Sequence, residues 1–459
     1  MAFSSKNHKL FLLIFFASLI IRLVSLFAAH DIWWDSAVYL GMGKYIYSFG
    51  KAGLWEASRP LMWPLILGFF WKINLDAVFF GKLLVALFSL GTLLLTYIIA
   101  LELFGRKTAV IASLFLALSP TFFLFGNVLH AEIPSAFFAL LGFCLFTRKS
   151  YSLSGLFLGI AFMTRFFQVL AFIPLALVIF FLFVRRKIPY KKLFYFSLFF
   201  LIPAIPYLAL NYFLYGAPLH PFILQAFMAK YTGWAFSQPF YYYFTGLIKE
   251  NALVLFSVIA LFSILKKPSL NSFSLALLFL FLFVPYNLIA HKEMRLLIPA
   301  LPFLFILAGY GLVCFAGLFK KNKTPVLSLL LLAFFVLNTA NLGFDGYEDS
   351  LDIFYDYIGN EEISNGLWIS NPAFIAYSDE KAEELIYYPL YSSGKIDELA
   401  EKVNSAKHIL INSCDILPCP PYDNFCDEKH IDFVNFLKER FDAQMHEIHG
   451  TCEYYIFSQ

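Results

Sequence analysis

Carboxylate side chains occur in short polar segments between long apolar runs of this sequence. Asp35 follows two tryptophans and precedes an amphipathic segment, 36–49. Glu132 lies in a short turn that separates two apolar runs and holds almost no other charge. Ionisable groups in apolar surroundings are costly, so they are usually paired or functional. Such a carboxylate could act as a general base or coordinate a metal ion.

Basic side chains of similar segments could bind an anion. Arg165 ends one apolar run, and Arg295 precedes another, with Lys292 one helical turn away. Guanidinium groups bind phosphate through charge-assisted hydrogen bonds. A structural interpretation stays open for two of these residues. Arg165 could extend to a membrane interface, and Glu132 could stabilise a helix start through the helix dipole.

The composition indicates an integral membrane protein. Of the 459 residues, 60% are hydrophobic and only 14% are charged. Soluble domains carry about 25% charged residues, and so much apolar surface suits contact with membrane lipid. The net charge is only +3, and no long basic run stands free of an apolar segment. Nucleic acid is therefore excluded as a partner.

Eleven apolar runs are read as membrane-spanning helices. They lie near 10–29, 78–101, 108–125, 131–147, 152–167, 168–184, 193–212, 248–265, 272–290, 296–318 and 325–342. The fifth and sixth are short and adjoin each other. The apolar run 60–73 contains two prolines and is too short to span, so we expect it to be interfacial or re-entrant. The sequence thus predicts an α-helical, multi-pass membrane protein.

The placement of lysine and arginine predicts the orientation in the cell membrane. With a cytoplasmic N-terminus, about twice as many basic residues fall on the cytoplasmic side as on the other side, as the positive-inside rule requires. The first outer loop, 30–77, is then the longest. Under this topology the polar segments containing Asp35, Glu132, Arg165 and Arg295 all lie at the extracytoplasmic surface.

From about residue 343 the composition becomes that of a small α/β domain. We divide the chain into a membrane domain, 1–342, and an extracytoplasmic domain, 343–459. Strands are expected at 366–370, 384–388 and 408–412, helices at 397–406 and 430–440, and a closing hairpin at 444–449 and 453–458. Four cysteines could oxidise outside the cytoplasm: Cys414, Cys419, Cys426 and Cys452. Their spacing favours disulfides over zinc, and three pairings stay open.

Several motifs resemble, in their order along the chain, those of the superfamily C (GT-C) membrane glycosyltransferases. The resemblance is to the protein mannosyltransferase and aminoarabinose transferase side of the superfamily, over roughly residues 10–320. The matching pieces are Arg22-Leu23, Asp35 with Tyr39, Arg59-Pro60-Leu61 with Pro64, Glu132, the glycine-rich segment 155–165 ending in Arg165, and Arg295 with Pro299 and Pro302. One departure is Ser36, because the family often has a second acidic residue at that position.

The resemblance implies a donor and an acceptor. The donor would be a polyprenyl-phosphate (dolichyl-phosphate-like) sugar, and a protein, lipid or glycan acceptor would receive the sugar with inversion on the extracytoplasmic side. Asp35 would be the acceptor-activating base and Glu132 a second acidic site residue. The substrate-binding residues would be Tyr39, Arg59, Arg165, His291, Lys292 and Arg295. No cofactor is certain, and a divalent metal ion, Mg or Mn, stays open.

Two other functions share part of this pattern. A ligase that moves a whole glycan from a lipid pyrophosphate would have the same architecture. A transporter of a lipid-linked sugar often has internal repeats and ionisable groups at the bilayer midplane. No clear repeat is visible, and apart from Arg22 the spans carry almost no charge away from their ends. A non-enzymatic scaffold would leave the polar outer segments unexplained, so the monosaccharide transferase is favoured.

Overall fold

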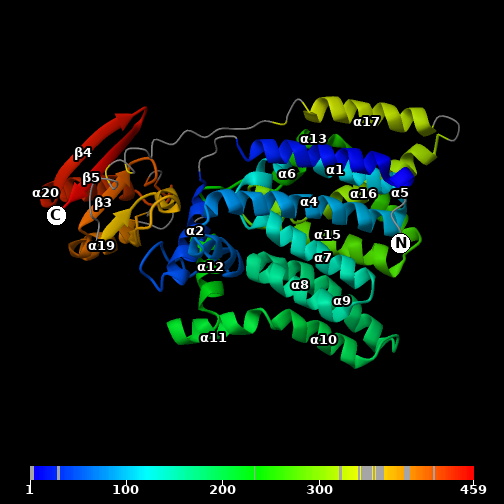
Figure 1. Cartoon of the computed structure of the whole chain (residues 1–459), viewed down its shortest axis with the longest axis horizontal. Coiled ribbons are helices and arrows are strands. Elements are labelled where there is room, and N and C mark those ends of the chain that lie inside the picture. Colours follow the sequence, from blue (N-terminus) through cyan, green and yellow to red (C-terminus); the bar gives the residue numbers. More distant parts are fainter. Residues whose placement is uncertain are drawn as a thin grey trace.

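A bundle of helices forms most of the protein, and a small sheet domain lies at one end of it (Figure 1). The computed structural model describes residues 5–27, 32–231, 233–319, 323–339, 342, 354, 357, 366–386, 393–416 and 419–459. The predicted fold class, an α-helical membrane bundle with a C-terminal α/β domain, is confirmed by this arrangement.

The helices of the bundle follow the apolar runs of the sequence. They are α1 (Ser5–Ser25), α4 (Ala77–Phe104), α5 (Arg106–Ala117), α6 (Pro120–Leu124), η1 (Phe125–Asn127), α7 (Glu132–Thr147), α8 (Tyr151–Thr164), η2 (Phe166–Gln168), α9 (Val169–Val184), α10 (Tyr190–Leu201), α11 (Ala204–Tyr215), η3 (Ala252–Leu255), α14 (Phe256–Lys266), α15 (Leu270–Leu288), α16 (Leu301–Gly317) and α17 (Lys323–Thr339).

Each of the eleven predicted spans coincides with one apolar helix or with a bent pair of helices. Among the described residues, four helices are long and apolar enough to cross a membrane, and the number rises to six if each bent pair is one span. Five shorter apolar helices match the other predicted spans. The positions of the helices therefore agree with the sequence, while the number that crosses the bilayer stays a prediction.

Proline accounts for the sharper of the two bends. The axes of α5 and the following α6–η1 segment differ by 66°. Ser119 caps α6 by accepting a hydrogen bond from the Phe122 backbone, and Pro120 lies in the first turn. Proline lacks a backbone donor and is well suited to the first turn of a helix. The bend redirects the chain toward the turn that contains His130.

Close packing of α8 against α10 depends on small residues. A Cβ atom at Gly155 would lie 2.1 Å from the Phe196 carbonyl oxygen, and one at Gly159 would lie 2.3 Å from that of Phe200. Small residues let helix backbones approach closely in membranes. The glycine-rich segment thus fixes α8, and Arg165 follows directly at its end.

Four further helices lie largely outside the predicted spans. They are α2 (Trp34–Tyr47), α3 (Met62–Lys72), α12 (His220–Tyr231) and α13 (Tyr242–Glu250). The amphipathic segment that follows Asp35 forms most of α2, and α3 covers most of the run predicted to be interfacial or re-entrant. The relation of α3 to the membrane surface stays a prediction.

The C-terminal domain is built on a five-stranded sheet of order β2-β1-β3-β5-β4. Its strands are β1 (Leu367–Ile369), β2 (Ala382–Leu385), β3 (His408–Asn412), β4 (Asp442–His449) and β5 (Cys452–Ser458). The pairs β1–β2 and β1–β3 are parallel, whereas β3–β5 and β5–β4 are antiparallel. Every predicted strand has a counterpart, although residues 387 and 388 of the second lie outside the described part.

Helices and disulfides complete this domain. The helices are α19 (Ser393–Lys402) and α20 (Cys426–Arg440), and the short segments are η6 (Pro372–Ala376) and η7 (Val403–Ser405). Both predicted helices are present, and each begins four residues earlier than expected. Disulfides join Cys414 to Cys452 and Cys419 to Cys426, which confirms oxidation and selects one of the three pairings. The boundary at 342/343 borders undescribed residues and stays a prediction.

Candidate active site

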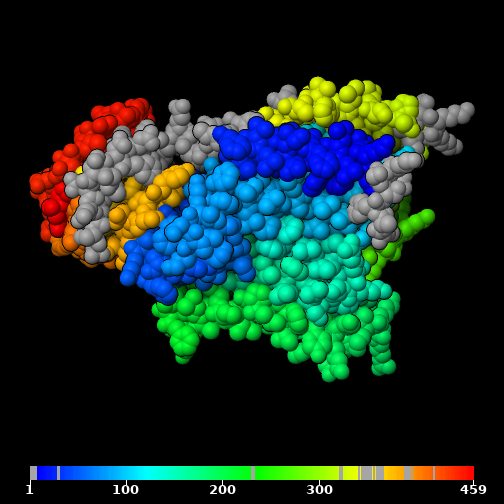
Figure 2. All heavy atoms as spheres, in the orientation of Figure 1, coloured from blue at the N-terminus to red at the C-terminus, as the bar shows by residue number. Residues whose placement is uncertain are grey.

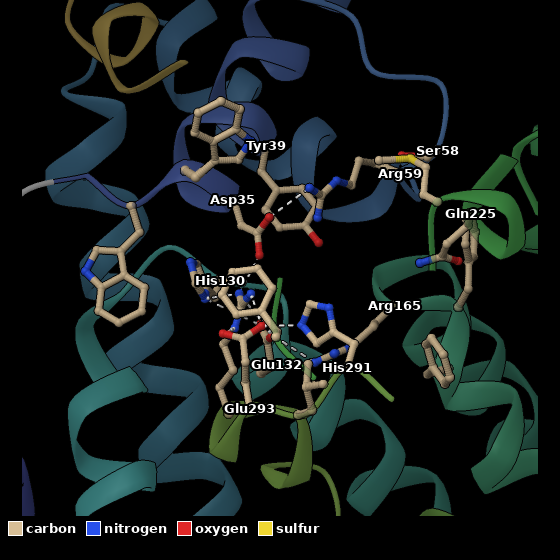
Figure 3. Close-up of a pocket in the computed structure, with 18 of the residues that line it drawn as sticks. Asp35, Tyr39, Ser58, Arg59, His130, Glu132, Arg165, Gln225, His291 and Glu293 are labelled. Atoms are coloured by element: carbon tan, nitrogen blue, oxygen red, sulfur yellow. Dashed lines mark hydrogen bonds and ion pairs between the residues drawn. The ribbon is translucent and has the colours of Figure 1, made fainter. Parts of the chain in front are cut away.

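Asp35 lies in the first turn of α2, where its carboxylate meets two guanidinium groups (Figure 3). Arg59 Nη2 donates a hydrogen bond to Oδ1 at 2.8 Å, and Arg295 Nη1 donates one to Oδ2. Burial alone would raise the pKa of Asp35, but the Arg59 and Arg295 guanidiniums hold that pKa well below its usual value. Asp35 is therefore ionised at neutral pH.

Glu132 begins α7 and takes part in the same group of charges. Its Oε1 atom lies 2.9 Å from Arg165 Nη1 and 3.8 Å from Arg295 Nη1. The Nδ1 atom of His130 lies 3.8 Å from Oε2. The predicted role of Glu132 at a helix start is compatible with this position, because the helix dipole favours a carboxylate in the first turn. Glu132 can thus stabilise α7 and still face the site.

Arg295 links the carboxylates to one another. Besides Asp35 and Glu132, it binds both oxygens of Glu293, with Nε donating at 2.8 Å and Nη2 at 2.9 Å. Its Nη1 atom also lies 3.2 Å from His130 Nδ1. This fork-shaped pairing with Glu293 fixes the plane of the guanidinium. The segment η4 (Met294–Leu297) therefore holds a cation among three carboxylates.

Two histidines stand beside these charges. His291 Nε2 lies 2.6 Å from Glu293 Oε1. Burial opposes ionisation of Glu293, but hydrogen bonds from His291 and Arg295 lower the pKa of its carboxyl to about 2. Burial and the Arg295 charge lower the pKa of the His130 ring to about 4. Glu293 is therefore ionised and His130 neutral at neutral pH.

Arg59 is held by its own segment of the loop between α2 and α3. Its Nε atom donates to Glu56 Oε1 at 2.9 Å, and the Ser58 hydroxyl donates to the same oxygen at 2.5 Å. Its guanidinium carbon lies 5.5 Å from the centre of the Tyr39 ring, within the range of a cation–π contact. The Tyr207 hydroxyl donates to the Arg59 carbonyl at 3.2 Å. The loop therefore presents Arg59 in one direction, toward Asp35.

These side chains share one cavity of about 740 Å³. Most predicted site residues line it: Asp35, Tyr39, Arg59, Glu132, Arg165, His291 and Arg295. The apolar part of the wall includes Phe166, Phe167, Met228, Trp234, Phe236 and Ile289. A cavity of this size with a few convergent polar groups is typical of a ligand site. The structure thus brings together residues that are up to 260 positions apart.

Lys292 is placed differently from the other predicted binding residues. It is not among the residues that line the cavity. Its ammonium donates to the carbonyl oxygens of Gln238 at 2.9 Å and Ile289 at 2.6 Å. A buried ammonium requires such partners. The position of Lys292 therefore fits a role in joining the loop at Gln238 to the end of α15.

The sequence interpretation missed several residues of the cavity wall, among them Glu56, Gln225, Trp234, Glu293 and Asp415. Two had a signal in the sequence. Glu293 lies inside the polar segment that supplied His291 and Arg295, and Glu56 lies three residues before Arg59. Gln225, Trp234 and Asp415 had none, because their approach to the cavity depends on tertiary packing.

A second, smaller cavity of about 420 Å³ shares Trp33, Glu293 and Arg295 with the first. Its other wall residues include Thr121, Tyr242 and Glu250. Hydroxyls of Ser119 and Thr121 donate to the Glu250 carboxylate. Arg295 therefore lines both cavities.

The ion pairs of Asp35 oppose a divalent metal ion at that carboxylate. Both oxygens of Asp35 contact guanidiniums, which would repel a cation at the same place. Within the described ranges, no three His, Cys, Asp or Glu side chains are grouped to hold a metal. Asp31, four residues before Asp35, lies outside those ranges. The described residues of the cavity therefore do not fit Mg or Mn.

A family model connects part of the chain with known proteins. The model of the dolichyl-phosphate-mannose-protein mannosyltransferases matches residues 58–209, about a third of the chain. The matched interval contains Arg59, Glu132 and Arg165. No protein of curated function has a sequence that matches this chain.

Solved structures share the fold over much more of the chain. ArnT from Cupriavidus metallidurans bound to undecaprenyl phosphate aligns with a TM-score of 0.69 and 12% identity, covering 98% of both chains. The oligosaccharyltransferase AglB from Archaeoglobus fulgidus, in complex with an inhibitory peptide and a dolichol-phosphate, has a TM-score of 0.63 and 12% identity. That alignment covers 88% of this chain and 69% of AglB.

The protein is an integral membrane protein with the fold of the GT-C membrane glycosyltransferases. The family model of the protein mannosyltransferases matches one part of the chain, and the structure of ArnT shares the fold of nearly all of it. The resemblance predicted from the sequence motifs is confirmed.

Proposed function

We propose that this protein transfers a sugar from a polyprenyl-phosphate donor to an acceptor at the extracytoplasmic surface of the membrane. One observation carries the proposal: three guanidiniums share a cavity with Asp35, Glu132 and three further carboxylates, and the other wall residues are largely aromatic and apolar. A lipid phosphate has the complementary form, with an anionic head and a long apolar tail. ArnT was solved with a ligand of this class.

The guanidiniums would bind the phosphate of the donor. Arg165 and Arg295 approach the same oxygen of Glu132, so their charges converge on one point. Arg59 adds a third guanidinium on the other side of Asp35. Fixed positive charges at the leaving group stabilise the negative charge that develops as the sugar departs. Binding and leaving-group stabilisation would thus use the same side chains.

Asp35 would accept the proton of the acceptor hydroxyl. The hydroxyl oxygen attacks the anomeric carbon of the sugar from the face opposite the phosphate. The new carbon–oxygen bond forms as the bond from that carbon to the phosphate oxygen breaks, and the electron pair leaves with the prenyl phosphate. The hydroxyl proton passes to Asp35. A single displacement of this kind inverts the anomeric centre.

Because Asp35 is ion-paired, donor binding would also change the basicity of its carboxylate. A carboxylate between two guanidiniums is a weak base. A donor phosphate would compete with Asp35 for Arg295 and Arg59. As these guanidiniums turn toward the phosphate, Asp35 would regain basicity. The base would thus become active only when a donor is bound, which limits unproductive proton transfer.

The orientation is part of the proposal. The N-terminus lies in the cytoplasm, and the cavity and the C-terminal domain lie outside it. The excess of lysine and arginine on the loops that lie on the same side as the N-terminus supports this orientation. The two disulfides support it as well, because disulfides persist in oxidising compartments.

The test is to incubate purified protein with a panel of prenyl-phosphate sugars together with protein, lipid and glycan acceptors, and to measure release of prenyl phosphate and formation of the glycosylated product. Wild-type protein and an Arg148→Ala control should release it from at least one donor. Arg148 forms an ion pair with Glu102 at 2.6 Å outside the cavity, so the control removes a comparable pair elsewhere. The anomeric configuration of the product should be opposite to that of the donor.

Other outcomes would identify the alternative functions. Consumption of lipid-pyrophosphate glycans alone would indicate a ligase. Movement of intact lipid-linked sugar across vesicles without bond cleavage would indicate a transporter. Cleavage of no donor of either kind would refute the transferase.

A further inference from the structure

The C-terminal domain supplies part of the cavity wall. Asp415 lines the same cavity as Asp35, although it belongs to the sheet domain. It follows β3, while Ser370 and Asn371 follow β1. Because β1 and β3 are parallel, their carboxyl ends lie at one edge of the sheet. Ligands of open α/β sheets bind outside such carboxyl ends.

Polar side chains orient Asp415 at this edge. The Ser370 hydroxyl donates to Oδ2 at 3.4 Å, and the Asn371 amide donates to Oδ1 at 3.3 Å. Asn371 also caps η6, because its Oδ1 atom accepts a hydrogen bond from the Ala373 backbone at 2.9 Å. The position of Asp415 therefore depends on where η6 is held.

Lys44 holds η6 against the helix that carries Asp35. Its ammonium is buried and donates to the carbonyl oxygens of Ile375 at 3.0 Å, Ala376 at 3.1 Å and Ser378 at 2.9 Å. The ammonium also lies 3.3 Å from Asp379 Oδ1, so all of its donors have partners beside η6. Since Asp35 and Lys44 both lie on α2, this contact fixes the end of η6 relative to Asp35.

A second contact joins the first outer loop to the sheet. The Gly53 backbone donates to the Glu380 carbonyl at 2.9 Å, and the Ala382 backbone donates to the Gly53 carbonyl at 2.9 Å. Gly53 has a φ of +83°, and a Cβ atom there would lie 2.1 Å from the Gly41 carbonyl oxygen. Only glycine fits both constraints. In Figure 2 the sheet domain (orange) lies directly against this loop (blue).

We propose that Asp415 binds a hydroxyl-rich acceptor, a glycan, and that Lys44 is the positioning residue that sets the place of Asp415 relative to Asp35. The inference rests on the proposed transferase function and names its acceptor class. A carboxylate flanked by an amide and a hydroxyl can accept hydrogen bonds from neighbouring sugar hydroxyls. One acceptor hydroxyl would lie at Asp35 while others reach Asp415.

The test measures glycan binding by the full chain in lipid nanodiscs saturated with a prenyl phosphate. The probes are methyl glycosides and short oligosaccharides. Wild type should bind at least one of them, and Asp415→Asn should weaken that binding about tenfold or more, as expected for a lost hydrogen bond to a charged group. The affinity for prenyl phosphate should not change.

A matched control lies at the opposite edge of the sheet. Asp442 is exposed at the start of β4, and Asp442→Asn should bind the glycan like wild type. Wild-type binding to no glycan, or equal binding by Asp415→Asn, would overturn the inference. A loss of prenyl-phosphate affinity in Asp415→Asn would also overturn it, because the residue would then serve the donor. Donor cleavage with no glycan binding would leave the transferase function standing.

The role of Lys44 has a separate test. Lys44→Met keeps much of the side-chain volume and removes the ammonium, so it should weaken glycan binding while prenyl-phosphate affinity stays unchanged. Lys44→Arg, which keeps a cation, should recover part of the affinity. A general folding defect would reduce both affinities. Unchanged glycan binding in Lys44→Met would refute the positioning role.

Discussion

The rim of the helix bundle and the C-terminal domain form two parts of one cavity by different physical means. At the rim, carboxylates and guanidiniums from α2, α7, η4 and the loops around them pair with one another. The C-terminal domain has an apolar core around residues such as Trp368 and Leu437, and two disulfides. It contributes one acidic side chain, Asp415, to the wall.

This comparison indicates that the ion pairs of the rim serve function, whereas the core and disulfides of the C-terminal domain serve stability. Burying ion pairs costs desolvation free energy that their attraction barely repays, so the rim is a poor way to stabilise a fold. A small domain, in contrast, gains stability from disulfides because its core is limited. The charges at the rim are therefore best explained by the ligand that we propose for them. Changes to the ion pairs of the rim should affect chemistry first, and changes to the apolar core and disulfides of the C-terminal domain should affect stability first.

The largest expected effect is that of Asp35→Asn. The amide keeps the shape of the side chain but accepts no proton, so transfer should fall by about 10²–10⁴-fold, as for loss of a general base. Turnover of the donor identified by the panel is the measurement, with Asp442→Asn as the control. Folding and donor binding should be largely retained. Turnover equal to that of wild type would remove Asp35 from the mechanism.

The next effect concerns the C-terminal domain. Replacing Cys414 and Cys452 together by serine opens a link between residues 38 positions apart. Loop-closure entropy predicts a loss of about 2–4 kcal/mol in the free energy of unfolding of this domain. Urea titration followed by limited proteolysis measures it. Replacing Cys419 and Cys426, which are 7 positions apart, should cost less. Weaker prenyl-phosphate binding with an intact C-terminal domain would contradict the division of roles.

A smaller effect depends on pH. The pKa of His130 in the folded protein is about 4, below its ordinary value of 6.5. The unfolded chain therefore binds more protons between these values, and stability should fall as the pH is lowered through this window. The unfolding temperature of His130→Gln should depend less on pH than that of wild type. His449→Gln, an exposed control, should behave like wild type. Equal slopes for wild type and His130→Gln would rule out this coupling.

Local patterns predicted the elements and the identity of most charged residues in the cavity. The apolar runs placed the helices because burial in lipid requires long apolar segments. Alternation and turn residues placed β3 and the closing hairpin. Asp35 and Glu132 could be predicted as site residues because a carboxylate in apolar surroundings has a high free-energy cost and is usually paired or functional.

Long-range packing could not be predicted from the sequence. Nothing local indicates that Lys44 binds η6, about 330 residues later, or that Asp415 reaches the cavity. Lys292 had the same sequence signal as Arg295, yet its ammonium binds backbone carbonyls instead of facing the cavity. The two side chains differ in direction because η4 begins at Met294, between Lys292 and Arg295.

The most direct test of the central claim is a titration of prenyl phosphate into wild type, Arg165→Ala, Arg295→Ala and the Arg148→Ala control. If the guanidiniums of the rim bind the phosphate, both rim variants should bind it about 10- to 150-fold more weakly, as for loss of a charge-assisted hydrogen bond. Arg148→Ala should match wild type. Wild-type affinity in both rim variants would contradict the account.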